Sequence, residues 1–192
     1  MTPGAHDPKA LVRPARGPLA YLITFTCYGT RLHGGEWGSV DRSHNLPTGP
    51  LAPADPRRIA AERGLMQSAP YSLDAPRRNV LLESIRSVCA SRNWDLLAVH
   101  IRMAHVHLVV CADAKPERVM IDLKAYASRS LNAAKLDALG QKRWSRHGST
   151  RYLWDWKGVL AAVDYAVCGQ GSPRTVLEKS VTEVRAAING RA

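Results

Sequence analysis

The stretch WDLLAVHIRMAHVHLVVCA, residues 94–112, is typical of two strands with almost nothing between them. Its halves, 94–103 and 105–112, are rich in Val, Ile and Leu, which suit a pleated, partly buried strand. Because so little chain separates the halves, the turn must be tight and the strands must pair antiparallel. The stretch therefore predicts a β-hairpin, and the rest of the fold can be placed around it.

Six further segments carry a strand or helix signal. Strands are indicated by β-branched and aromatic runs, and helices by apolar residues at helical spacing that begin after Pro116 or stop at Asn93 and Gly169. The predicted strands are 19–30 and 149–155, and the predicted helices are 72–93, 115–136, 156–169 and 173–190. The order β-α-β-β-α-β-α predicts an α+β fold, ferredoxin-like in outline, with helices packed on an antiparallel sheet.

The domain boundaries follow from composition. Residues 1–18 are rich in Pro, Gly and Arg, and we expect a flexible N-terminal segment there. The folded domain is expected over 19–170, with a C-terminal helix or tail at 171–192. Its long insert, 31–78, carries many Gly, Pro, Asp and Asn residues and one short helical piece, and so long an irregular insert is usually functional or partly disordered.

The charge balance points to a polyanionic partner. The 192 residues hold 27 Lys and Arg against 16 Asp and Glu, a net charge of +11 at pH 7. Nucleic acid is the leading candidate, and charge that serves only solubility is the alternative. The four cysteines show no C-x-x-C spacing, which predicts buried thiols without a disulfide or zinc site. No apolar run resembles a signal peptide or a membrane span, so we expect a cytoplasmic protein.

The hairpin places two histidines on one face. His105 and His107 are two residues apart in a predicted strand, so their side chains point the same way and Val106 points the other way. Such a pair is either a metal clamp or a half-exposed pair on a sheet face. Because the chain has seven histidines, one His-x-His pattern arises easily by chance and is weak evidence alone.

A tyrosine on the helix 156–169 is the second candidate. At 100° per residue, Tyr165 lies nearly opposite the apolar stripe of that helix and beside two small residues, Ala161 and Cys168. Its hydroxyl is therefore expected to be open, although a tyrosine packed under the C-terminal helix would also fit. The stripe itself consists of Val159, Leu160, Val163 and Val167.

Together these features resemble a known family, the single-tyrosine transposases of insertion sequences. These enzymes belong to the HUH nucleases and include the REP-associated tyrosine transposases. The resemblance is carried, in the family's order, by YLITFTCYGT, GSVDR, HVHLVV, DLKAYASRSLN, GSTRYLWD and VDYAVCGQG. It implies that His105, His107 and Gln170 bind a metal and that Tyr165 is the nucleophile. Tyr126, in the fourth motif, is a rival nucleophile.

The resemblance also implies a reaction and its partners. The family cuts single-stranded DNA, often folded as a hairpin, by tyrosine attack on a phosphodiester. The products are a 5′-phosphotyrosine and a free 3′-hydroxyl, and a hydroxyl later attacks the link to rejoin the strand. The expected cofactor is a divalent cation, Mg²⁺ or Mn²⁺. Mg²⁺ prefers oxygen ligands such as those of a phosphate, and imidazole ligands suit Mn²⁺ better. A homodimer is expected, as is common in the family.

Basic residues are expected to contact the DNA backbone, although each could equally be a solvated surface charge. Between 113 and 157 there are ten Lys and Arg against five Asp and Glu. Tyr152, Trp154 and Trp156 could stack on bases or form the core of a short strand. The expected DNA contacts are Arg42, Lys124, Arg129 and Arg151.

Three alternatives to the transposase function stay open. They are a cleavage-deficient DNA-binding protein, a metal-dependent hydrolase that uses water, and an RNA-binding protein.

Overall fold

The computed structural model describes residues 17–36, 38, 44, 49–138, 140–169, 175–176 and 183. The predictions that concern residues 1–16, Arg42 and Gln170 lie outside these residues. Along the chain, the helices and strands have the following bounds: β1 Ala20–Cys27, α1 Pro56–Gly64, α2 Ala75–Ser91, β2 Asp95–Ile101, β3 His105–Cys111, α3 Pro116–Ala133, β4 Trp144–Leu153, α4 Trp156–Val167 and β5 Thr175–Val176.

The strands form one antiparallel sheet in the order β4-β1-β3-β2-β5. The first four strands, with α2 and α3 as the crossing helices, have the arrangement of a ferredoxin-like fold. The α+β class is therefore confirmed. The hairpin of β2 and β3 is also confirmed, and its short turn is closed by a 2.9 Å hydrogen bond from the Arg102 amide to the His105 carbonyl. Strand β3, which carries the two histidines, lies in the middle of the sheet.

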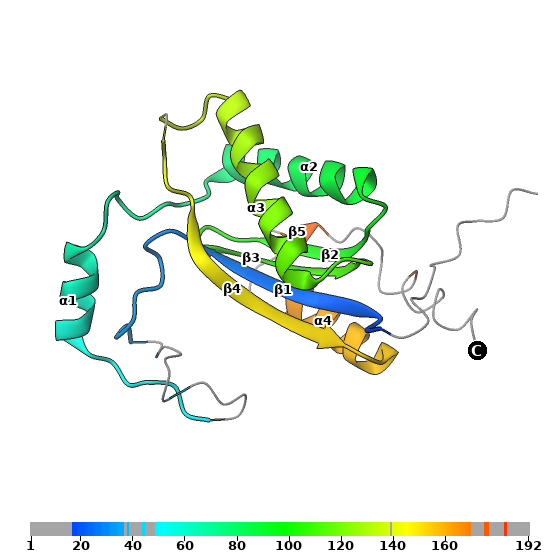
Figure 1. Ribbon diagram of the computed structural model, residues 1–192, viewed down its shortest axis with the longest axis horizontal. Coiled ribbons are helices and arrows are strands. Elements are labelled where there is room, and N and C mark those ends of the chain that lie inside the picture. Colours follow the sequence, from blue (N-terminus) through cyan, green and yellow to red (C-terminus); the bar gives the residue numbers. More distant parts are fainter. Residues whose placement is uncertain are drawn as a thin grey trace, which may run out of the picture.

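The two faces of the sheet are covered by different helices (Figure 1). Helices α2 and α3 pack on one face, where Phe25, Leu108 and Leu123 are almost completely buried. Helix α4 packs on the other face, against a smaller apolar cluster that includes Val109 and Val163. Because strand side chains alternate, every second residue of β3 faces α4. His105 and His107 are on that face, together with Val109.

Local sequence signals explain the helix limits. The Asp74 carboxylate accepts a hydrogen bond from the Arg77 amide at the start of α2, and Asp155 accepts one from the Gly158 amide at the start of α4. Such N-caps satisfy amides that have no partner within the helix. After α2, Asn93 has φ 56°, the left-handed conformation that ends many helices.

Three expectations need correction. Strand β4 begins at Trp144 rather than 149, because its first half, WSRHG, has few apolar residues and is recognised only through its pairing with β1. The helix predicted over 173–190 is wrong at Thr175–Val176, where two β-branched residues extend the sheet beside β2. Cys168 is exposed and Cys111 is only partly buried, whereas Cys27 and Cys89 are buried as expected.

A buried ionic cluster fixes the segment between α3 and β4. The Asp137 carboxylate, only 3% exposed, accepts hydrogen bonds from Arg77 (2.8 Å), Arg143 (2.7 Å) and the Tyr71 hydroxyl (2.9 Å). Burial alone would raise the pKa of Asp137, but these hydrogen bonds outweigh it and hold the pKa below its usual value. Arg143 is therefore a structural residue, although it belongs to the basic stretch that the sequence associates with DNA.

Candidate active site

The two histidines of β3 form a pair on the α4 face of the sheet. Their ring centroids are 4.7 Å apart, with the ring planes at 71°. His107 is buried, with 6% of its surface exposed, while His105 is partly exposed. The expectation that both side chains point the same way is therefore confirmed by the geometry.

The sheet register places a polar side chain on each side of His107. Thr24 of β1 and His100 of β2 are its cross-strand neighbours. The Thr24 hydroxyl lies 2.7 Å from His107 Nδ1, within hydrogen-bond distance. A hydrogen bond at one ring nitrogen fixes the orientation of an imidazole and decides which nitrogen can bind a metal. Thr24 therefore sets how His107 presents its ring.

His100 is the second neighbour, and it is completely buried. Its Nδ1 lies 2.8 Å from the carbonyl oxygen of Ala166 on α4. Burial lowers the pKa of His100, although the hydrogen bond to this carbonyl works in the opposite direction. The ring is therefore neutral near pH 7, and it connects β2 directly to α4.

Tyr165 stands beside the histidine pair. Its ring centroid is 5.5 Å from that of His107, with the planes at 75°, and 47% of its surface is exposed. The tyrosine thus lies off the buried stripe of α4, as its helical position predicts, and does not belong to the core. The stripe differs slightly from expectation: the buried residues are Val159, Ala162, Val163 and Ala166, whereas Leu160 and Val167 are only partly buried.

The rival tyrosine is elsewhere. Tyr126 is on α3, which packs on the opposite face of the sheet from the histidine pair. Its ring is 38% exposed, and the Arg129 guanidinium carbon lies 4.0 Å from the ring centroid. The sheet therefore separates Tyr126 from His105 and His107. Of the two candidate nucleophiles, the structure brings only Tyr165 to the pair.

The side chains at this site supply some of the ligands that a divalent cation needs. Two imidazoles side by side are suitable ligands for Mn²⁺ and related ions, and oxygens of a bound phosphate could fill further positions. Within the described residues, no group of three or more His, Cys, Asp or Glu side chains could hold a metal. Gln170, the third ligand implied by resemblance, lies outside those residues. The histidines alone therefore carry the metal prediction.

The predicted DNA contacts have different environments. Lys124 is half-buried, and its ammonium donates to the carbonyls of Ser145 (2.9 Å) and His147 (3.1 Å), so it serves to join α3 to β4. Burial lowers its pKa. Arg151 is exposed on β4 opposite Leu22, on the same face as the histidine pair. Arg129, on α3, is exposed on the other side of the sheet. Of these three cations, Arg151 shares the face of the candidate site.

Two aromatic side chains near the end of β4 are at the surface. Tyr152 and Trp154 are 41% and 65% exposed, and their rings stack with centroids 6.1 Å apart and planes at 15°. Of the two alternatives for Tyr152, Trp154 and Trp156, packing in the core of a short strand is therefore wrong for the first two. Trp156 is partly buried against the cluster under α4.

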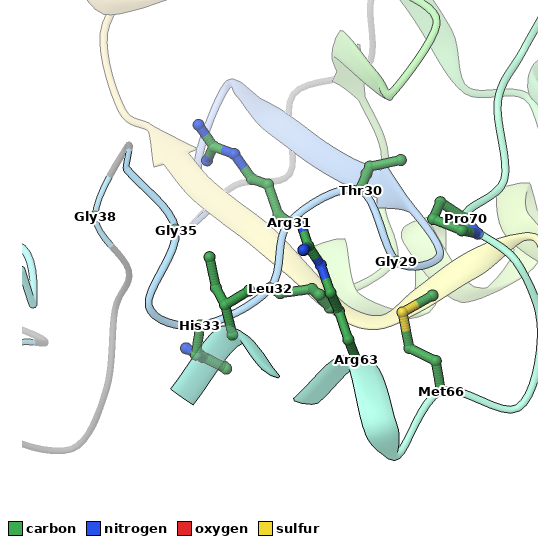
Figure 2. Close-up of a pocket in the computed structure, with 11 residues that line it drawn as sticks. Gly29, Thr30, Arg31, Leu32, His33, Gly35, Gly38, Arg63, Met66 and Pro70 are labelled. Carbon is green, nitrogen blue, oxygen red and sulfur yellow. The ribbon is translucent and has the colours of Figure 1, made fainter. Parts of the chain in front are cut away.

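The long insert contributes a pocket of about 680 Å³. Figure 2 shows that residues of the loop after β1, including Arg31 and His33, lie across from Arg63 and Met66, which belong to α1 and the loop after it. The Thr30 hydroxyl donates to the Cys27 carbonyl at 2.8 Å and approaches the Ala104 carbonyl at 3.3 Å. The pocket therefore begins near the His105 end of β3.

Sequence reasoning missed two residues of the site, Thr24 and His100. Thr24 belongs to a predicted strand, but nothing local to it indicates which residue of β3 it would face. For His100, the sequence did contain a signal for this contact. In a hairpin whose turn is centred on residues 103–104, residue 100 pairs with residue 107, so the spacing from His107 predicts the contact.

The fold and site define a class of protein: an antiparallel α+β domain with two histidines and an exposed tyrosine gathered on one face of its sheet. Residues 71–154 match the model of the family "Transposase IS200 like". This segment, somewhat less than half of the chain, is therefore similar to the IS200-like transposases. It contains His105 and His107 and ends before α4, so Tyr165 is beyond the match.

Two solved structures are similar to the chain. One is a REP-associated tyrosine transposase bound to a REP hairpin, with 13% identity and a TM-score of 0.46 over 84% of this chain and 72% of that one. The other is a Deinococcus radiodurans protein assigned as a transposase, with 14% identity and a TM-score of 0.41 over 76% and 87% of the two chains. No curated protein matches the chain significantly. Among the described residues, no helix is long and apolar enough to cross a membrane.

Proposed function

We propose that the protein is a metal-dependent transposase that nicks and rejoins single-stranded DNA, folded as a hairpin, through a 5′-phosphotyrosine intermediate. The family match supports a role in transposition. The observation that carries the finer proposal is the contact between Tyr165 and His107, whose ring centroids are 5.5 Å apart. An exposed phenol beside paired imidazoles is the arrangement that tyrosine attack on a metal-bound phosphate requires.

In the proposed reaction, the Tyr165 oxygen attacks the scissile phosphorus. The new bond joins this oxygen to phosphorus and the bond from phosphorus to the 3′-oxygen breaks. The phenolic proton passes to solvent, and the leaving 3′-oxygen takes a proton from solvent to become the 3′-hydroxyl. Because an ordinary tyrosine has a pKa near ~10, the phenol needs assistance at neutral pH. A divalent ion held by His105 and His107, with Gln170 as the third ligand, would supply positive charge to the phosphate and the leaving oxygen.

The phosphotyrosine keeps the energy of the broken phosphodiester, so the strand can be rejoined without a nucleotide cofactor. His107 is held for this role by Thr24, and His105, which is partly exposed, lies beside it. The net charge of +11 favours a polyanionic substrate, and Arg151 is the described DNA-contact candidate on this face. The homodimer remains a prediction; within one chain, Tyr165 already contacts His107.

The direct test uses labelled hairpin DNA with single-stranded flanks from the sequence that adjoins the protein's own gene. The DNA is incubated with Mn²⁺ and resolved on a denaturing gel. We expect a protein-linked band with wild type and with Tyr126→Phe, and none with Tyr165→Phe or His105→Ala. Loss of the band with Tyr126→Phe alone would move the nucleophile to α3. Hairpin binding without any band would favour the cleavage-deficient DNA-binding protein.

A further inference from the structure

We propose that His100 is a positioning residue that ties the turn of α4 carrying Tyr165 to the strand beside the histidine pair. This inference rests on the proposed function for its role in the reaction. His100 is completely buried and is the cross-strand neighbour of His107. Its Nδ1 is 2.8 Å from the carbonyl oxygen of Ala166, the residue that follows Tyr165. One side chain thus joins both halves of the candidate site.

The position of Ala166 explains why its carbonyl needs this contact. Helix α4 ends at Val167, so Ala166 lies in the last turn. Carbonyls of a last helical turn have no partner within the helix and must find one elsewhere. His100 supplies that partner from β2. The first part of α4 is held by the Asp155 cap and by the apolar contacts of Val159 and Val163, whereas the last turn has both the packing of Ala166 in the same cluster and the contact with His100.

The chemistry of the contact fixes the form of the ring. A carbonyl oxygen only accepts hydrogen bonds, so His100 Nδ1 must carry the hydrogen and donate it. In a neutral ring, Nε2 is then an acceptor. Among the side chains of the described residues, Nε2 of His100 is the buried polar atom that has no hydrogen-bond partner. Leaving such an atom unpaired costs free energy that a valine or leucine would avoid. The group of His100 that stabilises the structure is therefore Nδ1–H, which donates to the Ala166 carbonyl.

The contact between His100 and the Ala166 carbonyl controls the position of Tyr165, the proposed nucleophile. Tyr165 is at the surface, with 47% of its area exposed, and its ring contacts His107. Its position above His107 depends on the backbone of the last turn, which His100 anchors. Because misplacement of a reacting group by about 1 Å can cost roughly a hundredfold in rate, a loosened turn slows attack without weakening DNA binding. The effect should therefore appear in the rate of adduct formation, not in hairpin affinity.

The test compares three variants of the full chain. His100→Leu fills similar space without a donor, and His100→Asn keeps an N–H close to the position of Nδ1. Ile101→Val, on the other face of β2, is the control for general destabilisation. With labelled hairpin DNA and Mn²⁺, we expect His100→Leu to lower the rate of adduct formation by roughly tenfold to a hundredfold at unchanged hairpin affinity. His100→Asn should recover most of that loss, and Ile101→Val should stay near wild type.

Two measurements judge the tether without any reaction. Long-range ¹H–¹⁵N spectra of wild type should show the Nδ1–H tautomer at His100, and hydrogen exchange of the amides at the end of α4 should accelerate in His100→Leu relative to His100→Asn. An Nε2–H tautomer, or equal exchange and equal adduct rates in wild type and His100→Leu, would overturn the proposal. If wild type forms no adduct, the proposed function fails, and the spectra and exchange still decide the tether. If His100→Leu does not fold, the tautomer and His100→Asn decide it.

Discussion

Replacing Thr24 by valine removes one hydroxyl beside His107 and keeps the shape of the side chain. Both residues are β-branched, so the strand preference of β1 is preserved. The lost contact is the 2.7 Å hydrogen bond to His107 Nδ1. His107 is only 6% exposed, so Nδ1 gains little from water in exchange. The substitution therefore acts on the orientation of one imidazole and on little else.

The magnitude follows from the partner that is lost. When His107 Nε2 binds an ion, Nδ1 carries the hydrogen and donates it to the Thr24 hydroxyl. A buried donor left unsatisfied costs about 1–3 kcal/mol, and loss of a group that orients a metal-binding histidine typically costs about 10- to 100-fold in metal affinity. We therefore expect the Mn²⁺ concentration that gives half-maximal adduct formation to rise about 10- to 100-fold in Thr24→Val.

The assay is a Mn²⁺ titration of adduct formation, with thermal unfolding measured alongside in the absence of metal. Thr24→Ser, which keeps the hydroxyl, should require far less Mn²⁺ than Thr24→Val. At saturating Mn²⁺, Thr24→Val should regain much of the wild-type rate, because Tyr165 is unchanged. Identical Mn²⁺ curves for wild type and Thr24→Val would refute the view that Thr24 orients a metal ligand.

Two further predictions concern the Tyr165 turn and the buried ionic cluster. A Cβ at Gly169 would lie 2.8 Å from the Tyr165 carbonyl oxygen, so Gly169→Ala should displace that turn and slow adduct formation while hairpin binding persists. Gly158→Ala, in the first turn of α4, would place its Cβ at only an ordinary 3.5 Å contact to Asp155; it is the control and should react normally. In the ionic cluster, Asp137→Asn should destabilise the fold by about 3–5 kcal/mol at pH 7, measured by urea unfolding, because Arg77 and Arg143 lose their shared buried partner. The pKa of Asp137 is depressed in the folded state, so its contribution to the free energy of unfolding is complete above the unfolded pKa of about 4 and is lost as the pH falls further. The difference in stability between wild type and Asp137→Asn should therefore shrink in acid. A pH-independent difference would contradict this account.

The sequence could predict what depends on local spacing. Alternation along one strand placed His105 and His107 on the same face, and helical spacing placed Tyr165 away from the apolar stripe of α4. What it could not predict depends on pairings between distant segments. The register of β1 against β3 brings Thr24 to His107 across 83 residues of chain, and no local pattern encodes that match.

The same distinction explains the missed strands. The first half of β4 is polar at most positions, and it becomes a strand because β1 offers an unpaired edge. Thr175 and Val176 similarly extend the other edge, beside β2. Their preference for strand over helix was readable from β-branching, but the partner was not. Nor could the sequence show that α4, rather than α3, covers the face with the histidine pair.

The way the two faces of the sheet are covered explains how this fold accommodates a polar site. Helices α2 and α3 cover one face of the sheet (Figure 1). They bury large apolar side chains against it and so provide most of the core. Helix α4 meets the other face through two valines, Val159 and Val163, and two alanines, Ala162 and Ala166. Small side chains bring its backbone close to the sheet, close enough for a histidine on β2 to reach a helix carbonyl. The same closeness brings the tyrosine that precedes Ala166 to His107. A larger residue at 166 would separate α4 from the sheet, break the His100 contact and move Tyr165 away from His107 in a single step.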